Sequence, residues 1–492
     1  MQTIQIPQKR FRMIIPAFPP EGIFSGFNKR ITSLGAVLIA TIVDKYLPNW
    51  TAEIIDENNY HKGPLDAHQP VDHRTLQAET PADAVGFYCG LSSSVPRVWQ
   101  LARFYKEQGV LTIAGGWHVH YMPEESLNKG LDVVVKGDGE QAILDVLTAF
   151  GQDQPPRGII HREQTDLNAL PIPDFGLLRY AKVRIYPIGR IRGCSKQCEF
   201  CSVKGQPRCS SPDYVFRVVK WLVETRRAKS FFITDDRMEE DREGYLELFR
   251  MIAQQFTNRL RFTVQVRLAA IQDKELIDAM RQAGVRHVCI GIESPIEEEL
   301  KGMHKGMRVD HMIQYARAWR KYFFVHGMFI FGYPLTNPSD ISYRERINRF
   351  KRFIRKSKID TIQVLRPVPL IGTKLRERLQ ENGQLFPLEL VGWDKYDGNY
   401  VCFKPNNMSV EELQKGPTKI MTGFYNRFAR FLLPIRTVTL PFYYPITGWH
   451  YWYRGWWNEV IKVWGYRLLK KWKNDEQAFL EKIQDPSAMK QV

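Results

Sequence analysis

The chain has 492 residues, of which 44% are hydrophobic and 25% are charged. These are ordinary globular values, and the length allows about three domains at roughly 150 residues each. They exclude a fibrous or wholly disordered chain, and seven cysteines are too few for a small disulfide-stapled scaffold. The net charge of +17 favours anionic partners, either nucleic acid or anionic lipid headgroups, without choosing between them.

The sequence predicts a cytoplasmic protein. Its first twenty residues lack the long apolar core and the small-residue cleavage site of a secretory signal. It contains no run of 18 or more apolar residues that would span a bilayer. In a reducing compartment, neighbouring cysteines serve as metal ligands more often than as disulfides.

Residues 1–160 alternate strand-like and helix-like segments. This alternation predicts an α/β domain with a doubly wound, Rossmann-like parallel sheet, whose ligands lie beyond the carboxyl ends of the strands. A buried helix is predicted at residues 34–46. The predicted strands are residues 11–15, 51–55, 84–88, 110–114 and 133–135.

The pattern changes twice further along the chain. Residues 161–184 are predicted to be a linker, and a second β/α series occupies residues 185–384. Its six β/α units predict a partial barrel, in which chemistry takes place at the C-terminal strand ends. Residues 385–492 are predicted to form a mainly helical extension rich in aromatic and basic residues. The predicted barrel strands are residues 185–188, 231–234, 261–266, 288–292, 327–331 and 361–365.

The segment RGCSKQCEFCS places Cys194, Cys198 and Cys201 at the spacing C-x3-C-x2-C, on a loop after the first barrel strand. Three thiolates this close can bind three irons of a [4Fe–4S] cluster and leave the fourth iron open for a substrate or cofactor. The alternative is a zinc site that Cys209 completes.

The context of this triplet resembles the radical SAM (S-adenosylmethionine) superfamily. Phe200 stands directly before the third cysteine, as an aromatic residue does in that family. One departure is that Leu370 and Ile371 precede Gly372 in the family's sixth-strand segment, which ends in P-x-P-G-T. The segments that resemble the family's second to sixth strands are FFITDD (231–236), FTVQVRLAAIQDKELIDAMRQAGVRHVCIGIES (262–294), HGMFIFGYP (326–334) and VLRPVPLIGTKL (364–375).

The resemblance implies a radical reaction. The open iron binds the amino and carboxylate groups of S-adenosylmethionine, and one electron from a donor such as flavodoxin or ferredoxin cleaves the sulfonium. The resulting 5′-deoxyadenosyl radical abstracts hydrogen from an unactivated carbon. The residues expected to contact S-adenosylmethionine are Phe200, Asp235, Asp236, Gln265, Arg267 and Glu293.

Several of these residues have a structural alternative. Asp235 or Asp236 can instead cap the following helix, and Glu293 can instead form an ion pair within the barrel. Arg366, at the end of the sixth strand, either faces the site or forms an ion pair. Gln265 and Arg267 have the same parity on their strand, as an inward face requires.

The N-terminal domain resembles that of the cobalamin-dependent subclass of this superfamily, in LGAVLIATIVDKY (34–46), GGWHVHYMPEE (115–125) and VVVKGDGE (133–140). The resemblance implies bound cobalamin, and the alternative is a degenerate domain that only shapes the active site. The D-x-H-x-x-G motif, whose histidine ligates cobalt, is not found after the first strand, and we interpret His68 as a loop residue. The residues expected to line the cobalamin site are Ser92, Ser93, Ser94, Gly115, Gly116, His118, Gly137, Gly139 and Glu140.

Residues 449–473 contain six of the chain's twelve tryptophans and six basic residues against one acid. Such a segment is typical of a helix that lies on an anionic membrane. The alternative is an amphipathic helix packed on the barrel, with its tryptophans in the core. Residues 392–413 resemble C-terminal regions of cobalamin-type radical SAM proteins that act on lipids, such as hopanoid methylases.

Together these features predict cobalamin-dependent C-methylation of an apolar, lipid- or isoprenoid-like substrate, in the cytoplasm or at the inner face of the membrane. The alternative is radical SAM cyclisation, oxidation or carbon–carbon coupling without methyl transfer. Modification of nucleic acid is less favoured. The transfer RNA methylthiotransferases, which resemble this barrel, carry a further cysteine trio in the N-terminal domain, where this chain has only Cys89.

Overall fold

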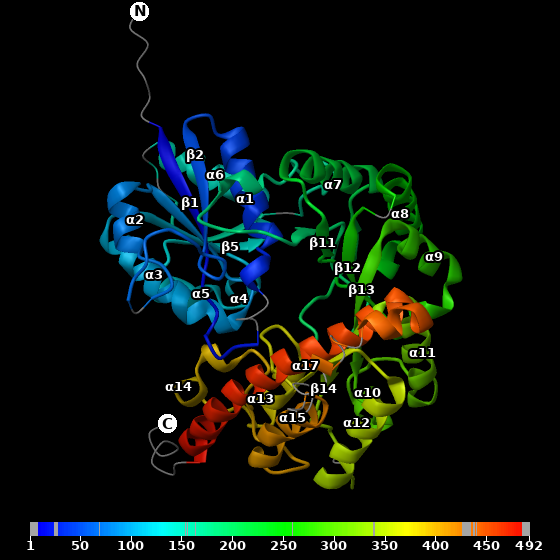
Figure 1. Ribbon diagram of the computed structural model, residues 1–492. Coiled ribbons are helices and arrows are strands. Elements are labelled where there is room, and N and C mark those ends of the chain that lie inside the picture. The colour runs from blue at the N-terminus through cyan, green and yellow to red at the C-terminus, as the bar shows by residue number, and fades with distance from the viewer. Residues whose placement is uncertain are drawn as a thin grey trace, which may run out of the picture. The chain divides into compact units, whose positions relative to one another are not determined.

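The structure is a computed structural model that describes residues 8–23, 28–67, 69–152, 154, 156–162, 164–257, 259–337, 340–425, 434, 435, 438 and 440–484, with backbone only for 440–453. His68 and part of the loop after the first strand lie outside the described residues. The chain divides into two compact units (Figure 1). The first unit comprises Met1–Ser195, Gly205–Thr263 and Gln282–Gly284, and the second comprises Lys196–Lys204, Val264–Arg281 and Val285–Val492.

The N-terminal part of the first unit is built on a seven-stranded sheet in the order β6-β5-β4-β3-β1-β2-β7, with every neighbouring pair parallel. The chain moves from β1 to β2 in one direction and from β3 to β6 in the other, so the sheet is doubly wound, as predicted. The crevice at such a reversal, here between the carboxyl ends of β1 and β3, is where ligands bind in these sheets. The strands are β1 (Lys9–Ile15), β2 (Trp50–Asp56), β3 (Ala84–Tyr88), β4 (Leu111–Gly115), β5 (Val133–Gly137), β6 (Gly158–Arg162) and β7 (Leu178–Arg179).

The segment predicted as a linker, residues 161–184, contributes to this sheet. It contains the end of β6 and the whole of β7. Neither strand has a run of buried apolar residues: β6 alternates half-buried and exposed positions at the sheet edge, and β7 has two residues. Hydrophobic patterning therefore gives little indication of them.

Helices cover both faces of this sheet. Helix α1, which begins and ends as predicted, packs with α6 on one face. The other face buries Ile14, Val85 and Phe87 against Val98 and Leu101 of α3. The helical elements here are η1 (Asn28–Arg30), α1 (Leu34–Tyr46), α2 (His73–Glu79), η2 (Ser92–Ser94), α3 (Val95–Glu107), α4 (Trp117–Tyr121), α5 (Pro123–Asn128), α6 (Gly139–Gly151) and η3 (Phe175–Leu177).

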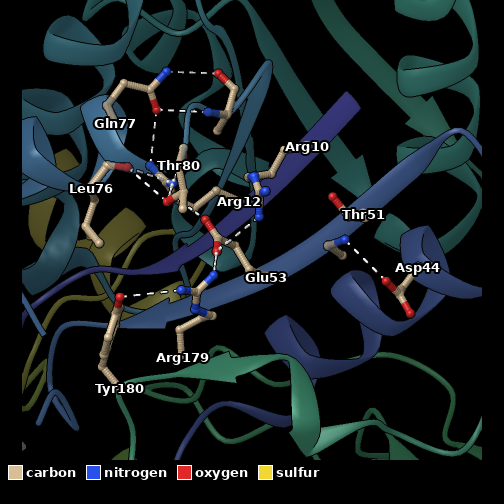
Figure 2. A network of polar contacts seen from close by, with 12 residues as sticks. Arg10, Arg12, Asp44, Thr51, Glu53, Leu76, Gln77, Thr80, Arg179 and Tyr180 are labelled. Atoms are coloured by element: carbon tan, nitrogen blue, oxygen red, sulfur yellow. Dashed lines mark hydrogen bonds and ion pairs between the residues drawn. The ribbon is translucent and has the colours of Figure 1, made fainter. Parts of the chain in front are cut away.

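A buried ion pair joins the centre of this sheet to its edge. Arg12 of β1 is fully buried, and its Nε donates to Glu53 Oε1 of β2 at 2.7 Å. Arg12 also donates to the Tyr105 hydroxyl at 3.1 Å. Arg179 of β7 donates to the second oxygen of Glu53 at 3.0 Å (Figure 2). Arg10 lies 3.7 Å from the same oxygen, so the Glu53 carboxylate balances three arginines, of which Arg12 is out of contact with water.

A second sheet follows in the order β15-β14-β13-β12-β11-β8, and the boundary between the two units falls within β12. The pairs β8–β11, β11–β12, β13–β14 and β14–β15 are parallel. All six predicted barrel strands are present. They are β8 (Tyr186–Ile188), β11 (Ser230–Ile233), β12 (Arg261–Val266), β13 (Val285–Glu293), β14 (Phe324–Ile330) and β15 (Thr361–Leu365).

Helices alternate with these strands, and several begin at a serine cap. Ser211 accepts the Tyr214 amide at the start of α7, and Ser342 accepts the Glu345 amide at the start of α12. A short antiparallel pair, β9 (Ile191–Arg192) and β10 (Arg208–Cys209), follows β8. The helical elements are α7 (Pro212–Arg226), η4 (Met238–Asp241), α8 (Arg242–Phe256), η5 (Leu268–Gln272), α9 (Lys274–Ala283), α10 (Glu297–Gly302), α11 (Val309–Tyr322), α12 (Tyr343–Ser357) and α13 (Lys374–Glu381).

The C-terminal extension is mainly helical where it is described, as predicted. It contains α14 (Leu388–Val391), η6 (Trp393–Lys395), α15 (Val410–Phe424) and the 45-residue α17 (Leu440–Gln484) (Figure 1). Helix α17 packs along α15 within the second unit, where a Cβ on Gly465 would meet the Tyr425 ring at 2.5 Å. Among the described residues, none of the helices has the length and apolar character that crossing a membrane requires.

Replacing Glu53 tests the buried ion pair. In Glu53→Ala, the Arg12 guanidinium stays buried without its carboxylate, and such a loss costs about 3–5 kcal/mol. We expect amide hydrogen exchange in β1 and β2 to report a local loss of this size. Asp213→Ala is the control, because Asp213 forms an exposed pair with Arg217 and such pairs contribute about 0–1 kcal/mol. Equal effects of the two substitutions would contradict the assignment.

Candidate active site

The cysteine loop, residues 193–207, leaves and re-enters the fold through β9 and β10. All seven cysteines of the chain are described and are free thiols, and the three of the predicted motif are half-buried. On the first-unit side, the amide and hydroxyl of Ser195 both donate to Glu240 Oε1 at 2.9 Å, and Cys194 also lies within hydrogen-bond reach of that carboxylate. Arg237 pairs with the same oxygen at 2.7 Å. The Cys194 end of the loop is therefore held by η4.

Glu199 holds the other end of the loop within the second unit. Its carboxylate is buried and accepts a bidentate pair from Arg378 at 2.7 and 3.0 Å and the Tyr333 hydroxyl at 2.5 Å. Its backbone is bonded to Met303 and Leu375. These contacts set the course of the chain between Cys198 and Cys201. Sequence patterning does not indicate this role, because the partners of Glu199 are 134 and 179 residues away.

The donor set fits an iron–sulfur cluster in its chemistry. Three unoxidised, partly exposed thiols at C-x3-C-x2-C are the ligands that such clusters use. Within the described part of the chain, no three histidine, cysteine, aspartate or glutamate side chains are gathered around one point, and this holds for the three cysteines of the motif with or without Cys209. Burial raises the pKa of the Cys209 thiol. The assignment of Cys194, Cys198 and Cys201 as ligands remains a prediction from their spacing.

Lys305 links three of the residues predicted to contact S-adenosylmethionine. Its ammonium lies 2.6 Å from Glu293 Oε1 and 5.9 Å from the centre of the Phe200 ring, and its backbone oxygen accepts a 3.3 Å bond from Arg267. Burial lowers the pKa of Lys305, but the Glu293 carboxylate outweighs this and holds the pKa above its ordinary value. The ion-pair alternative for Glu293 is thus present, with a partner that sequence patterning did not identify.

The backbone at Glu293 is strained. Its φ is +64°, in the left-handed region that residues other than glycine rarely adopt, and the ladder to β14 is irregular between Gly291 and Glu293. Strain of this kind persists where the surroundings over-determine it and is frequent at active sites. The irregularity turns Glu293 toward Lys305 at the carboxyl end of β13.

Two other strand ends carry predicted site residues. Gln265 of β12 and Arg267, which directly follows β12, are both half-buried and alternate with buried neighbours, and the inward face predicted for them stays a prediction. At the end of β11, Asp235 is buried and accepts the amides of Arg190 and Ile191 at 2.8 and 3.0 Å and the Tyr245 hydroxyl. Asp235 therefore supports the turn between β8 and β9, while Asp236 next to it is exposed.

Arg366 forms the structural ion pair that was the alternative for this residue. It is buried at the end of β15, 2.6 Å from Glu476 of α17. It also donates to the carbonyl of Gln414 and the hydroxyl of Thr418 in α15. Arg366 thus joins the sheet to the C-terminal helices.

The predicted cobalamin residues lie at the carboxyl ends of β3, β4 and β5. Ser92, Ser93 and Ser94 form η2 and are buried, and no partner among the described residues bonds the Ser93 hydroxyl. A buried hydroxyl without a partner fits a polar ligand at this edge, because leaving it unbonded is costly. His118 is fully buried with Nδ1 3.0 Å from the Ser92 hydroxyl, so it supports the serine turn from within the domain.

The glycines at this edge let backbone segments approach closely. Gly116 has a φ of +123°, and a Cβ there would lie 2.6 Å from the Cys89 carbonyl carbon. At Gly115, by contrast, an added Cβ would have Val135 as its nearest neighbour, at 4.0 Å. The amide of Gly137 donates to His120 Nδ1 at 3.2 Å.

Glu140 does not face open space. Its Oε1 accepts from Arg192 Nη2 at 2.5 Å, and its neighbour Asp138 accepts from Arg208 at 2.8 Å. These arginines, which the sequence did not single out, belong to β9 and β10. The carboxylate of Glu140 forms an ion pair with Arg192. The expected contact of Glu140 with cobalamin remains a prediction.

Two family models match the chain in this arrangement. The radical SAM superfamily matches residues 188–345, and the B12 binding domain matches residues 29–147. The chain therefore contains a radical SAM domain and a B12-binding domain, in the order that the sequence predicted. Its cofactors are a [4Fe–4S] cluster, S-adenosylmethionine and cobalamin.

The chain is similar in sequence to proteins that are named as methyltransferases and to one that is named as a cyclase. An uncharacterized methyltransferase of Pyrococcus horikoshii is 25% identical over 379 residues, which are 70% of this chain and 79% of the relative. The hopanoid C-2 methylase of Rhodopseudomonas palustris is 26% identical over 365 residues, 70% of this chain and 64% of the relative. The anaerobic magnesium-protoporphyrin IX monomethyl ester cyclase of Cereibacter sphaeroides is 24% identical over 358 residues, 66% and 57% of the two chains.

A solved structure shares the fold. The cobalamin-dependent S-adenosylmethionine radical enzyme OxsB, with aqua-cobalamin bound, matches with a TM-score of 0.65 and 11% identity over 97% of this chain and 81% of that chain. Together with the two family models, this likeness confirms the predicted order of a Rossmann-like domain followed by a radical SAM barrel.

Replacing Glu199 tests whether its network fixes the cysteine loop. In Glu199→Ala, Arg378 and Tyr333 lose their shared acceptor, and we expect iodoacetamide to alkylate Cys198 and Cys201 about tenfold faster, which corresponds to about 1.4 kcal/mol of easier opening. The measurement is peptide mass spectrometry of the metal-free protein. Glu224→Ala, at an exposed position of α7, is the control and should leave both rates unchanged. Unchanged alkylation rates of Cys198 and Cys201 in Glu199→Ala would contradict the role of Glu199 in fixing the loop.

Proposed function

We propose that the protein is a radical SAM methyltransferase that uses cobalamin to methylate an unactivated carbon of an apolar, lipid- or isoprenoid-like substrate. The observation that carries this proposal is the union, in one chain, of a B12-binding domain with a radical SAM domain that keeps all three cysteines of its motif. The similarity to a hopanoid C-2 methylase supports an apolar substrate.

The proposed division of labour follows the geometry. Cys194, Cys198 and Cys201 would hold the cluster, which with bound S-adenosylmethionine supplies the 5′-deoxyadenosyl radical, while cobalamin supplies the methyl group. Glu199 and Glu240 fix the course of the cysteine loop from its two ends. A loop fixed in advance needs no reorganisation when the cofactors bind.

Paired charges suit the amino acid end of S-adenosylmethionine. That end carries an ammonium and a carboxylate, and the Glu293–Lys305 pair offers the two complementary charges 2.6 Å apart. Both side chains are largely buried, which strengthens electrostatic contacts relative to water. Gln265 and Arg267, both half-buried at the end of β12, add polar groups.

Helix α17 supports action at a membrane surface. One side of it packs on the barrel, where Arg454 bonds the carbonyls of Arg320 and Phe323 at 2.6 and 2.7 Å. On another side, Trp464 is 66% exposed and Leu468 is 36% exposed, four residues apart and therefore on one face. Exposed basic residues surround them, namely Arg467, Lys470, Lys471 and Lys473. An aromatic and aliphatic anchor with basic neighbours suits an anionic lipid surface.

A second candidate is radical SAM cyclisation or another carbon rearrangement without methyl transfer. The similarity to a magnesium-protoporphyrin IX monomethyl ester cyclase favours it. The two candidates differ in whether the product carries a new methyl group from S-adenosylmethionine.

Analysis of the metal and corrin content tests the proposal first. Protein purified without oxygen should contain about four irons and one corrin per chain, and should transfer a labelled methyl group from S-adenosylmethionine to lipid extract. Four irons with no corrin, even after cobalamin is supplied, would favour the second candidate. Absence of a cluster after reconstitution would overturn both.

Single cysteine variants test the ligand assignment. We expect Cys198→Ala to lose the visible absorption of the cluster and the cleavage of S-adenosylmethionine, because the cluster then lacks one of its three thiolates. Cys209→Ser is the matched control and should keep both. A loss of iron in Cys209→Ser equal to that in Cys198→Ala would support a site that includes Cys209.

Vesicle flotation tests the membrane surface. The full chain should float with vesicles rich in phosphatidylglycerol. Trp464→Ala with Leu468→Ser should weaken binding at least about tenfold, because the apolar anchor is lost and its two side chains together contribute at least about 1.4 kcal/mol. Trp221→Ala is the control, since Trp221 is 46% exposed on α7. Equal binding to neutral vesicles, or no effect of the paired substitution, would count against the proposal.

A further inference from the structure

Two acids of the B12-binding domain reach the base of the cysteine loop. They belong to the turn of residues 137–140, which ends β5 and begins α6. Glu140 accepts from Arg192 at 2.5 Å, and Asp138 lies 3.4 Å from Arg192 and 2.8 Å from Arg208. All four residues belong to the first unit.

The two arginines face each other across a very short ladder. Arg192 and Arg208 are register partners in the antiparallel pair β9–β10, which has only two residue pairs. Like charges directly opposite each other destabilise such a pair, and two short strands are marginal on their own. Asp138 contacts both guanidinium groups, so it neutralises the repulsion at the point where it arises.

The acids are themselves held in place. Glu140 is buried, and Asp138 also accepts the Thr165 amide at 2.9 Å. Gly137, which begins the turn, has a φ of +93°, and a Cβ there would lie 2.7 Å from the Arg162 carbonyl oxygen. The turn therefore presents its two carboxylates from a fixed backbone, and ion pairs removed from water are screened little by salt.

The ladder closes the loop that contains all three predicted cluster ligands. Residues 193–207 lie between β9 and β10, so opening of the ladder would detach both ends of the loop that contains Cys194, Cys198 and Cys201 and leave it held only by the contacts of Glu240 and Glu199. We propose that Asp138 and Glu140 are positioning residues that keep the cysteine loop closed by neutralising Arg192 and Arg208. The consequence for the cluster rests on the proposed function, whereas the closure of the loop is a property of the metal-free chain.

Reversal of one charge tests this role. In the metal-free full chain, Glu140→Arg places a third positive charge beside Arg192, and we expect amide hydrogen exchange in residues 193–207 to rise at least about tenfold. Asp213→Arg is the matched control, an acid of α7 whose pair with Arg217 is exposed, and should leave that exchange unchanged. Unchanged exchange in Glu140→Arg would overturn the proposal.

The double variant separates positioning from general damage to the fold. Arg192→Glu in the Glu140→Arg background recreates an opposite-charge pair and should return the exchange of residues 193–207 to within about twofold of the parent. Failure of this rescue would overturn the proposal. If Glu140→Arg does not fold, a double-mutant cycle of Glu140→Gln and Arg192→Gln replaces it, again read from the amide exchange of residues 193–207. Non-additive effects of the two substitutions support the pair, and additive effects contradict it.

A spectroscopic readout connects the loop to the cluster. After reconstitution, Glu140→Arg should lose iron to a chelator faster than the parent and show a broadened electron paramagnetic resonance signal of the reduced cluster, and the double variant should recover both. A parent-like signal and rate in Glu140→Arg, despite faster amide exchange, would overturn the link to the cluster. A parent protein that takes up no cluster would instead contradict the proposed function and leave the exchange result standing.

Discussion

A charge that is removed from water must be paired, and this constraint organises the loops around the predicted site. Breaking a buried pair costs several kcal/mol, about 3–5, because the remaining charge stays desolvated. Glu199 with Arg378 and Glu140 with Arg192 join segments 179 and 52 residues apart, and Glu293 with Lys305 joins the end of β13 to the segment that follows α10. Each pair allows few alternative conformations to the loop that carries it. The pairs contribute order at particular places more than they contribute overall stability.

The parallel sheets explain why these pairs occur where they do. In both sheets the carboxyl ends of neighbouring strands meet at one edge, so the polar residues that follow different strands are brought near each other. Asp138 and Glu140 follow β5, Asp235 follows β11, and Glu293 ends β13. The strands supply the position through apolar packing, and the residues just beyond them supply the charge. Strain at Glu293 is tolerated because Lys305 and the irregular ladder fix its place.

The sequence predicted what depends on local patterns and missed what depends on distant partners. The buried strands and α1 are rich in apolar residues over short stretches, so their positions could be predicted and are confirmed. The cysteine spacing is also a local feature, and the ligand role that it indicates stays a prediction. The strands β6 and β7 were missed because an edge position and a length of two residues leave little hydrophobic pattern. Lys305, Arg192 and the partners of Glu199 were missed because only the fold brings them together. Arg366 shows the same limit: its position at a strand end was predicted, but its partner Glu476 is 110 residues away.

Basic side chains occur in two environments, the interior of the fold and the exposed side of α17. Inside the fold, basic side chains are matched to acids: Arg12 to Glu53, Arg366 to Glu476, and even Arg346, within the basic stretch of α12, to Glu299. The exposed stretch of α17 near Trp464 has basic residues without a comparable number of acids, since residues 460–473 contain no aspartate or glutamate. Charge arranged in this way contributes little to folding and a great deal to long-range attraction of anionic partners. Trp464 and Leu468 lie among these basic residues, and this combination of apolar and basic side chains is the reason for proposing an anionic lipid surface, rather than a nucleic acid, as the partner.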